Sequence, residues 1–311
     1  MKKEDKIFIA GHTGQIGAGI FEKLKKSGYT NIVIKNHSEL DLLNSKMVQD
    51  FFNKEKPDYC FYCAGSLGSF EYFDNKKAAV LYENMLMQMN VLKSAVTVGV
   101  KKVLYLGSGS VYGDKLESPF TEENAIDCIQ HGGLESYAIA KVSGLEFAKC
   151  FDGINGTKII SVLPTHCFGF VSPERMKANV IESSMKALYE AKEKEIDSIQ
   201  LDIWGTGKKA LRQYVYLNDM ADAIVYLMNN YDEQIPVNIA TDEVYCLDDV
   251  IKILKEVIGY KGTVYYMTDK PERYEKRLLS TIHLKETGWK AEYTMHKALK
   301  DMVIKYKNYI G

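Results

Sequence analysis

Three glycines near the start of the chain follow a spacing that few folds use. The apolar run at residues 7–10 leads into a G-x-x-G-x-x-G pattern, and a helical apolar repeat follows it. Glycine lets a backbone turn tightly and approach a pyrophosphate, while the free N–H groups of a helix start attract the phosphate charge. The order strand, turn and helix therefore predicts a dinucleotide site. Its residues are Gly11, Thr13, Gly14, Gln15, Ile16 and Gly17.

The second expected strand, residues 31–37, suggests which dinucleotide binds. A site for NAD usually ends this strand with an acid that holds the ribose 2′-hydroxyl. Lys35 and His37 stand at that end here, which favours NADPH/NADP. Ligands of open α/β sheets bind at the carboxyl ends of strands, so we add Ala64, Gly65 and Pro164 to the cofactor site.

The first half of the chain alternates strands with helices. Strands are expected at residues 59–64, 103–107 and 158–163, with helices at 75–98 and 134–150 and a polar loop at 114–133. This alternation predicts an α/β fold with a doubly wound parallel sheet. After residue 165 the rhythm changes: a helix is expected at 179–194 and a strand at 199–204, with a final helix ending near residue 309.

The change of rhythm predicts two domains. Residues 1–165 plus about 211–240 would bind the cofactor, and about 166–210 plus 241–311 would form a smaller α/β substrate domain. A length of 311 residues is sufficient for both.

Composition narrows the function classes. A net charge of −1 gives no field for nucleic acid, and no apolar run approaches the length of a membrane span. The first residues lead directly into a strand rather than a signal peptide, so we expect a cytoplasmic protein. Cys60 and Cys63 lie inside an apolar strand pattern on opposite faces and lack a second pair, so no metal site is expected.

Three residues form a candidate catalytic set. Ser108 follows the fourth strand, and Tyr137 and Lys141 are spaced i, i+4 on one helix face. A cation within a few ångströms lowers the pKa of a tyrosine by roughly 1 to 3, so we expect Lys141 to tune Tyr137. Ser108 would hold a carbonyl that accepts hydride while Tyr137 donates the proton, and Tyr137 and Lys141 would also contact the cofactor. This set predicts an oxidoreductase.

These residues, together with the glycine turn, resemble the extended short-chain dehydrogenase/reductase family. The likeness is stronger to the GDP-L-fucose synthase branch, over essentially the whole chain. It rests on Gly11-His12, residues 38–43 and 135–141, Trp204 to Gly207 with Arg212, and Gly288-Trp289. The resemblance implies a Rossmann-type sheet, a homodimer, NADPH, and a GDP-linked 4-keto-6-deoxy sugar as substrate.

The resemblance also implies the residues that bind the sugar nucleotide. Trp204 and Arg212 stand at the family's nucleotide-sugar positions, and Arg277 stands where the family has a diphosphate-binding cation. A guanidinium suits a diphosphate because it donates two parallel hydrogen bonds. We include Lys186 among the substrate-binding candidates.

Two departures from the family pattern concern epimerisation at C3 and C5. The family uses a cysteine and a histidine, where this chain has Ser110 and Asn179. An alcohol is a far weaker acid than a thiol, and an amide does not titrate, so we expect C4 reduction without epimerisation. Ser110 and Asn179 would instead orient the sugar. Such sugars enter bacterial capsule and lipopolysaccharide.

Two further departures leave alternatives open. His166 replaces a family asparagine beside the expected nicotinamide and is expected to bind by hydrogen bonds, although it offers a substitute acid for a bifunctional epimerase-reductase. Thr13 replaces an arginine that helps hold the extra phosphate of NADPH. A sugar 4,6-dehydratase or 4-epimerase is disfavoured because Gly109-Ser110 cannot replace its Asp-Glu pair. A non-catalytic NADP-binding regulator is disfavoured by the intact Tyr137 and Lys141.

Overall fold

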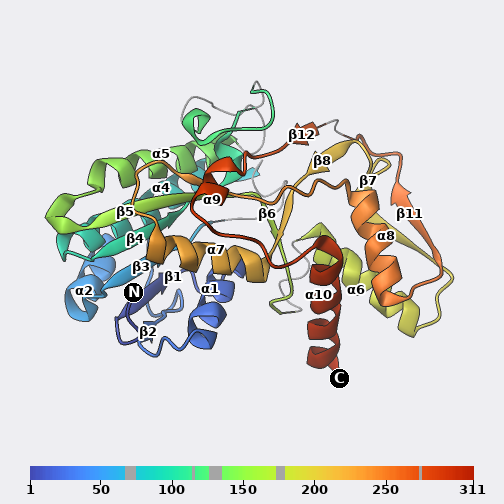
Figure 1. The fold of residues 1–311 in the computed structure, drawn as a ribbon, viewed down its shortest axis with the longest axis horizontal. Coiled ribbons are helices and arrows are strands. Elements are labelled where there is room, and N and C mark those ends of the chain that lie inside the picture. Colours follow the sequence, from blue (N-terminus) through green and yellow to red (C-terminus); the bar gives the residue numbers. More distant parts are fainter. Residues whose placement is uncertain (67–74, 114–115, 126–134, 173–178, 273–274) are drawn as a thin grey trace.

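A six-stranded parallel sheet forms the larger part of the molecule (Figure 1). The computed structural model describes residues 1–66, 75–113, 116–125, 135–172, 179–272 and 275–311. The strand order is β10-β5-β4-β3-β1-β2, and all neighbours run in the same direction. These strands are β1 (Ile7–Ala10), β2 (Ile32–Val33), β3 (Tyr59–Tyr62), β4 (Lys102–Leu106), β5 (Lys158–Pro164) and β10 (Val237–Ile239).

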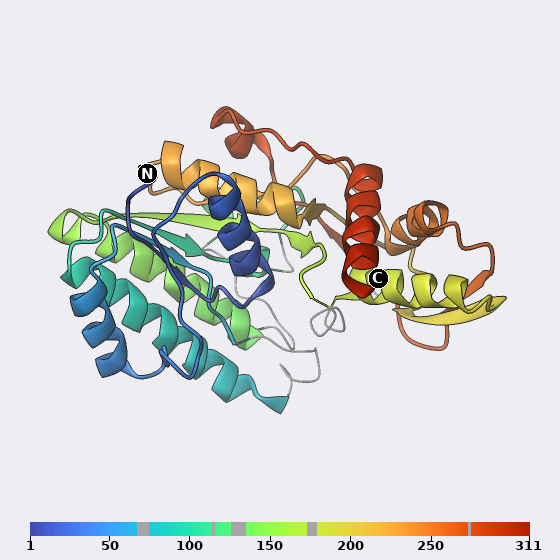
Figure 2. The same cartoon turned by 90° about the horizontal axis from the view of Figure 1, so that it is seen from below.

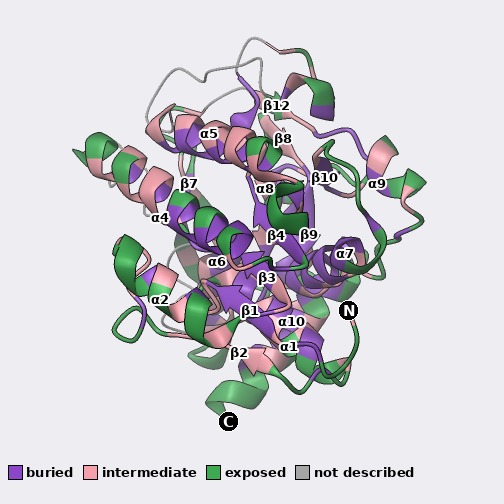
Figure 3. Cartoon of the chain, turned by 90° about the vertical axis from the view of Figure 1, so that its left-hand side faces the viewer, coloured by how far each residue is buried: buried purple, intermediate pink, exposed green. Residues whose placement is uncertain are grey.

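Helices cover both faces of this sheet, as Figure 2 shows. On one face lie α1 (Gln15–Lys26) and α7 (Leu217–Asn230), which contribute to a single buried apolar cluster. On the other face lie α2 (Ser45–Glu55), α4 (Lys77–Thr97) and α5 (Glu135–Phe151), which share a second cluster. Figure 3 shows the consequence, with the central strands β1 and β4 buried, the edge strand β2 partly buried and the outer helix faces exposed. The doubly wound parallel sheet is therefore confirmed.

A third apolar cluster lies in the remaining part of the chain. It joins α6 (Val180–Glu193), α8 (Leu247–Ile258) and α10 (Met295–Ile310). Three parallel strand pairs accompany these helices. They are β6 (His166–Phe168) with β9 (Tyr214–Tyr216), β7 (Ser198–Trp204) with β11 (Thr263–Met267), and β8 (Ala210–Arg212) with β12 (Glu275–Arg277).

The proposed domain boundaries remain a prediction. The third cluster has the content expected of a second domain, which we call the second lobe. However, α9 (Ile282–Glu286) and the residues after it return to the large sheet, because Leu284 and Trp289 pack in the α1–α7 cluster.

Some local expectations need correction. The second strand spans only Ile32–Val33, so Lys35 and His37 follow the strand instead of ending it. This strand lies at the sheet edge. After it, the Glu39 carboxylate accepts a hydrogen bond from the Asn36 N–H and so stabilises the turn of the chain. Strand β12 and helix α9 were not expected at all. Residues 114–115 and 126–133 of the loop expected at 114–133, including Cys128, lie outside the described residues, as does residue 134 at the start of the expected helix.

Two further findings bear on the sequence-based exclusions. None of the described helices has the length and hydropathy needed to span a bilayer. Cys60 packs in the cluster beneath α4 and α5, whereas Cys63 packs against the α1–α7 cluster. The two sulfurs therefore belong to opposite faces of the sheet.

Candidate functional site

In the glycine turn, backbone atoms of Gly11, Gly17 and Ala64 pack closely at the point where the strand order of the sheet reverses. Gly11 has φ of +87°, and a Cβ there would lie 2.6 Å from the Ala64 nitrogen at the end of β3. A Cβ on Gly17 would lie 2.2 Å from the Gly11 oxygen. Only glycine fits both positions without a backbone shift.

The first helix begins without a side-chain cap. Gly14 stands at its N-cap, and the Gly14 N–H donates to the Gly11 carbonyl at 2.9 Å. The N–H groups that follow, from Gln15 and Ile16 onward, start α1 beside the exposed Thr13. An uncapped helix start at the switch point between β1 and β3 is an anion site of the kind that holds a dinucleotide pyrophosphate.

The end of β3 is held by an asparagine that the sequence analysis missed. Asn84 on α4 is 1% exposed and accepts from the Ser66 N–H at 2.9 Å, while its amide donates to the Ser66 carbonyl at 3.1 Å. This fixes the segment that begins with buried Ala64 and exposed Gly65. An asparagine within an otherwise apolar stretch of helix needs buried hydrogen-bond partners, and this pattern would have identified Asn84 from the sequence.

Lys35 and His37, which were predicted to bind the 2′-phosphate of NADPH, lie beside carboxylates of this chain. Lys35 forms an ion pair with Glu39 at 3.2 Å, and His37 has an 80% exposed side chain 3.8 Å from Asp41. A hydrogen bond from the Asn36 N–H, followed by the effect of Lys35, lowers the pKa of Glu39. Any anion that binds Lys35 must therefore compete with this carboxylate.

Ser108, Tyr137 and Lys141 come together at the carboxyl end of β4. Ser108 is hydrogen bonded to Tyr137, and Ser110 donates from its Oγ to Ser108 Oγ at 2.9 Å. Lys141 is 3% exposed and its Nζ donates to the Leu106 carbonyl at 2.8 Å. The serine turn also lies close to Pro164, since a Cβ on Gly109 would be 3.1 Å from the Pro164 oxygen.

The electrostatics of Tyr137 differ from the prediction. Burial raises the pKa of Tyr137, and the hydrogen bond with Ser108 offsets only part of that effect. Burial lowers the pKa of Lys141 to about 8. The Lys141 Nζ donates to a backbone carbonyl and lies 5.8 Å from the centroid of the Tyr137 ring, and the net pKa of Tyr137 is raised where the sequence analysis expected it to be lowered. Tyr137 is therefore a neutral phenol at physiological pH.

A charged cluster lies where the second lobe meets the sheet. Arg212 and Arg277 are register partners on β8 and β12, and the carboxylate of Glu275 bridges them. Its Oε2 lies 2.7 Å from Arg212 Nη2, and its Oε1 lies 3.3 Å from Arg277 Nε. Arg277 Nη2 also donates to the Tyr112 carbonyl. We call Arg212, Glu275 and Arg277 the arginine cluster.

His166 belongs to the edge of this cluster. Its Nε2 lies 3.1 Å from Arg212 Nη1, and a guanidinium can only donate, so Nε2 is the acceptor. Desolvation by the surrounding protein atoms, followed by the charges of Arg212 and Arg277, lowers the pKa of His166 to about 3, although the residue is exposed at the surface. The expected hydrogen-bonding role toward the ligands stays a prediction, and a neutral imidazole is a poor acid.

A buried carboxylate connects the glycine turn with α6. Glu182 is 2% exposed, and its Oε1 accepts from Gln15 Nε2 at 2.8 Å, from the Gly169 N–H at 2.9 Å and from Asn179 Nδ2 at 3.2 Å. Desolvation outweighs these bonds and raises the pKa of Glu182. Within the described residues its Oε2 has no hydrogen-bond partner.

Two predicted substrate-binding residues, Trp204 and Lys186, lie on the second lobe. Trp204 ends β7 with 54% of its surface exposed, and the turn after it is held by Glu272, which accepts from the Thr206, Lys208 and Lys209 N–H groups. Lys186 lies 3.8 Å from Glu190 one helical turn later.

Comparison with known proteins places this geometry in a family. A model of NAD dependent epimerases and dehydratases matches residues 7–240, most of the chain. The chain belongs to the NAD dependent epimerase/dehydratase family. Its α/β fold, its oxidoreductase class and a nicotinamide dinucleotide cofactor, all predicted above, agree with this family and with its solved neighbours.

Relatives within the family match almost the full chain. A putative GDP-L-fucose synthase 2 from Arabidopsis thaliana is 33% identical over 302 residues, covering 96% of this chain and 90% of the relative. A GDP-L-colitose synthase from Yersinia pseudotuberculosis is 28% identical, covering 91% and 92%. The solved structure of MlghC, a GDP-mannoheptose C4 reductase from Campylobacter jejuni with NADP bound, has a TM-score of 0.88 and 29% identity, with 99% of both chains covered. The predicted resemblance to GDP-L-fucose synthases is thus confirmed.

Sequence reasoning missed Glu275 and Glu182 in this site. Glu275 and Arg277 are two residues apart, a spacing that places both side chains on one face of a strand. Glu182 occupies the third position of a helix after Asn179, where an acid stabilises the helix start. Both signals were present, but each required a known strand or helix boundary.

Proposed function

We propose that this protein is an NADPH-dependent reductase that converts the C4 ketone of a GDP-linked 4-keto-6-deoxy hexose or heptose to an alcohol, without epimerising C3 or C5. The observation that carries the proposal is the Ser108–Tyr137 hydrogen bond above buried Lys141 at the carboxyl end of β4. Relatives named as GDP-sugar synthases and reductases support the substrate class. We place the product in bacterial capsule or lipopolysaccharide synthesis.

The residues present fit a dinucleotide. Gly11 and Gly17 leave the turn without side-chain bulk, and the uncapped start of α1 offers N–H groups to a pyrophosphate. We assign Gly14, Gln15, Ile16, Ala64, Gly65 and Pro164 to the same cradle and Lys35 with His37 to the 2′-phosphate. When bound, NADPH supplies the hydride.

The chain's own groups then control the substrate oxygen. Ser108 holds the ketone oxygen by a hydrogen bond, and Tyr137, kept neutral by burial, donates a proton to the oxygen as it becomes an alcohol. Lys141 places a positive charge beneath the phenol and favours the phenolate that remains. The arginine cluster binds the diphosphate, with Trp204 and Lys186 at the nucleotide, and Ser110, Asn179 and His166 orient the sugar.

The hydrogen bonds of the substituted residues support the loss of epimerase activity. Ser110 donates its hydroxyl to Ser108, and Asn179 donates its amide to Gln15 and Glu182. Neither group is basic enough to remove a sugar proton. His166, with a pKa of about 3, is a weak base as well.

Turnover in heavy water tests both parts of the proposal. Each GDP-4-keto sugar of a panel is incubated with NADPH in D₂O, oxidation is followed optically, and the product is examined by NMR. We expect NADPH oxidation and no deuterium at C3 or C5. Deuterium at either carbon would contradict the loss of epimerisation, and no oxidation with any sugar would contradict the reductase itself and favour a non-catalytic regulator.

A bifunctional epimerase-reductase is the second candidate because of Glu182. Its carboxyl has a raised pKa and contacts Asn179, which stands at the position of the family's epimerase histidine. If deuterium does enter the product, Glu182→Gln identifies the base: the exchange is lost in this variant and kept in His166→Gln. Exchange lost only in His166→Gln would instead implicate the imidazole.

We also propose a homodimer formed through α4 and α5. These helices pack together on one face of the sheet, and α4 exposes Tyr82 and Met89 at 65% and 36%, seven residues apart on one helix face. Light scattering is expected to give twice the monomer mass, and Tyr82→Arg is expected to return a monomer.

A further inference from the structure

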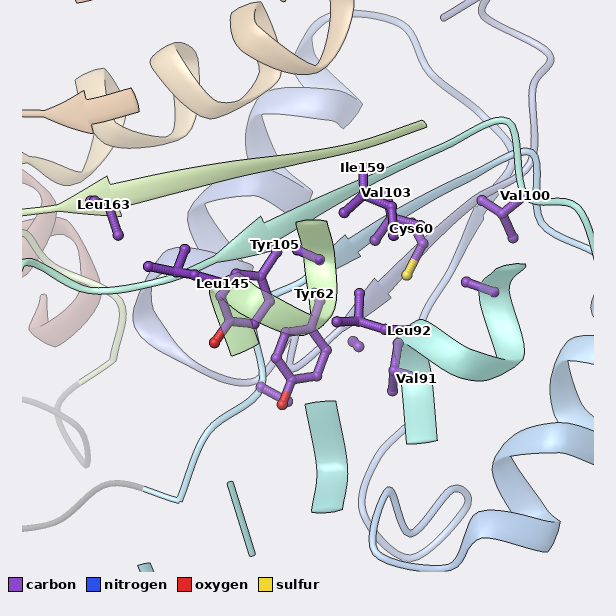
Figure 4. Packing of buried hydrophobic residues seen from close by; sticks show 14 of the residues in the cluster. Cys60, Tyr62, Val91, Leu92, Val100, Val103, Tyr105, Leu145, Ile159 and Leu163 are labelled. Atoms are coloured by element: carbon purple, nitrogen blue, oxygen red, sulfur yellow. The ribbon is translucent and has the colours of Figure 1, made fainter. Parts of the chain in front are cut away.

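Three tyrosine rings surround the Lys141 ammonium. Its Nζ lies 5.3 Å from the ring centroid of Tyr105 and 5.8 Å from the centroids of Tyr62 and Tyr137. Tyr62 and Tyr105 are register partners on β3 and β4, and their rings stack with centroids 5.7 Å apart and an interplanar angle of 7°. Figure 4 shows the two rings side by side, with both hydroxyls directed to the same side.

Groups on two helices hold Tyr105 in place. The Tyr105 hydroxyl donates to Gln88 Oε1 at 2.8 Å, and the Gln88 amide donates to the Ala140 carbonyl at 2.7 Å and to Ser143 Oγ at 3.1 Å. Gly144 leaves room for the phenol, because a Cβ there would lie 1.9 Å from the Tyr105 oxygen. The ring position is therefore fixed by α4 and α5 together.

The ammonium has few other groups to replace its hydration. Lys141 is 3% exposed and its ammonium donates to the Leu106 carbonyl; within the described residues, no carboxylate is among the groups that shift its pKa. The titratable groups that face it are the three tyrosines and the Cys63 thiol, which burial keeps neutral. Aromatic faces within about 6 Å attract a cation, and more strongly when water is excluded.

We propose that Tyr62 and Tyr105 are positioning residues that hold the Lys141 ammonium beneath Tyr137 through their ring faces, in place of a carboxylate. The proposal rests on the catalytic role of Lys141 in the proposed function. It assigns to β3 and β4 a part in proton transfer although neither tyrosine is placed in contact with the substrate.

The first test uses the free protein and needs no turnover. Protein labelled with ¹³C at the lysine ε-carbons is titrated by NMR, with the Lys141 signal assigned by its loss in Lys141→Met. We expect the Lys141 ε-protons to be shifted upfield by the three rings, with a titration midpoint near 8. An unshifted Lys141 signal in the wild-type protein would overturn the proposal, whichever variants fold.

Three variants then separate the ring from its hydroxyl and from packing. Tyr62→Leu removes the ring and is expected to reduce the upfield shift and to lower the midpoint by about half to one pH unit. Tyr62→Phe keeps the ring and is expected to keep both values. Phe61→Leu removes an equally buried ring that faces the other side of the same strand, and should leave the Lys141 signal unchanged.

The second test is the pH dependence of kcat. Because the reaction needs Lys141 charged, the alkaline limb of the Tyr62→Leu profile should move to lower pH, while the limbs of Tyr62→Phe and Phe61→Leu stay in place. A loss of kcat at every pH without movement of the limb would overturn the positioning role. If the NMR shifts appear but wild-type protein reduces no keto sugar, the proposed function fails and the contact between rings and ammonium stands.

Discussion

At the scale of single residues, the surroundings of Tyr137 suit a general acid. Burial keeps its phenol neutral, Ser108 bonds to it, and Lys141 lies beneath its ring. A neutral phenol is the correct starting state for reduction, which consumes one proton. Burial has the larger effect on the Tyr137 pKa, so the phenol is neutral before transfer, and the Lys141 ammonium lies 5.8 Å from the ring centroid where the phenolate forms.

Tyr137→Phe removes this proton and leaves the ring in place. We expect kcat for ketone reduction to fall by about 10²- to 10⁴-fold, the usual contribution of a general acid. NADPH affinity, measured by fluorescence titration, should fall far less than kcat, because only the contact of the Tyr137 hydroxyl is lost and the glycine turn is intact. Turnover equal to that of the wild-type protein would show that another group supplies the proton.

Glu275→Gln tests the arginine cluster. The carboxylate neutralises part of the charge that a diphosphate would meet, so the amide should lower KM for the GDP-sugar by about 3- to 10-fold and steepen its dependence on salt. Glu256→Gln, an exposed acid paired with His296, is the matched control. A raised KM in Glu275→Gln would mean that the carboxylate is needed to hold Arg212 and Arg277 in place.

At the scale of elements, the glycine turn and its helix act as one unit. A Cβ on Gly17 would lie 2.2 Å from the Gly11 carbonyl oxygen, whereas a Cβ on nearby Gly19 would lie within 3.4 Å of side-chain atoms alone, of which the nearest is the end of Leu217 at 2.7 Å. The Gly11 backbone cannot move away from an added methyl group, whereas the Leu217 side chain can change its conformation.

Gly17→Ala is therefore expected to weaken NADPH binding at least tenfold and to destabilise the fold by about 1–3 kcal/mol. Gly19→Ala should cost less on both measures because Leu217 can change rotamer. Calorimetric titration with NADPH and thermal unfolding of both variants check this. Equal effects at the two positions would contradict the assignment of Gly17 to the cradle.

The lengths and pairing of the helices and strands explain which parts of the fold and site can be predicted from the sequence. Periodicity found β1, α1 and α5, so Gly11, Gly14, Tyr137 and Lys141 could be placed by spacing alone. Strand β12 has three residues and pairs with a strand more than 60 residues earlier, so no local pattern predicts that Glu275 joins Arg212. The pKa of Tyr137 likewise depends on burial by distant segments, which spacing does not contain.

At the scale of the whole molecule, one buried carboxylate links the glycine turn to the second lobe. Glu182 accepts from Gln15 on one side and from Asn179 on the other. Burial raises its pKa above 4.5, so the folded state binds this proton more tightly than the unfolded state does. Its stabilising contribution is complete below pH 4.5 and is lost as the pH rises through the folded value.

Glu182→Gln stays neutral at every pH and should remove this loss. We expect its melting temperature to exceed that of the wild-type protein at pH 8, with a smaller difference at pH 5. Thermal unfolding across this range measures both, and Glu256→Gln, an exposed acid, should show no such trend. A variant that is less stable than wild type at pH 8 would show that the charged carboxylate is the stabilising form.

The space that Gly144 leaves for the Tyr105 phenol also constrains how this enzyme can diverge. A methyl group at position 144 cannot coexist with a tyrosine ring at position 105, because it would lie 1.9 Å from the hydroxyl oxygen and 2.3 Å from the ring carbon that carries it. Descendants that gain alanine at the first position must therefore lose the phenol at the second, and the two sites should change as a pair when many homologues are aligned.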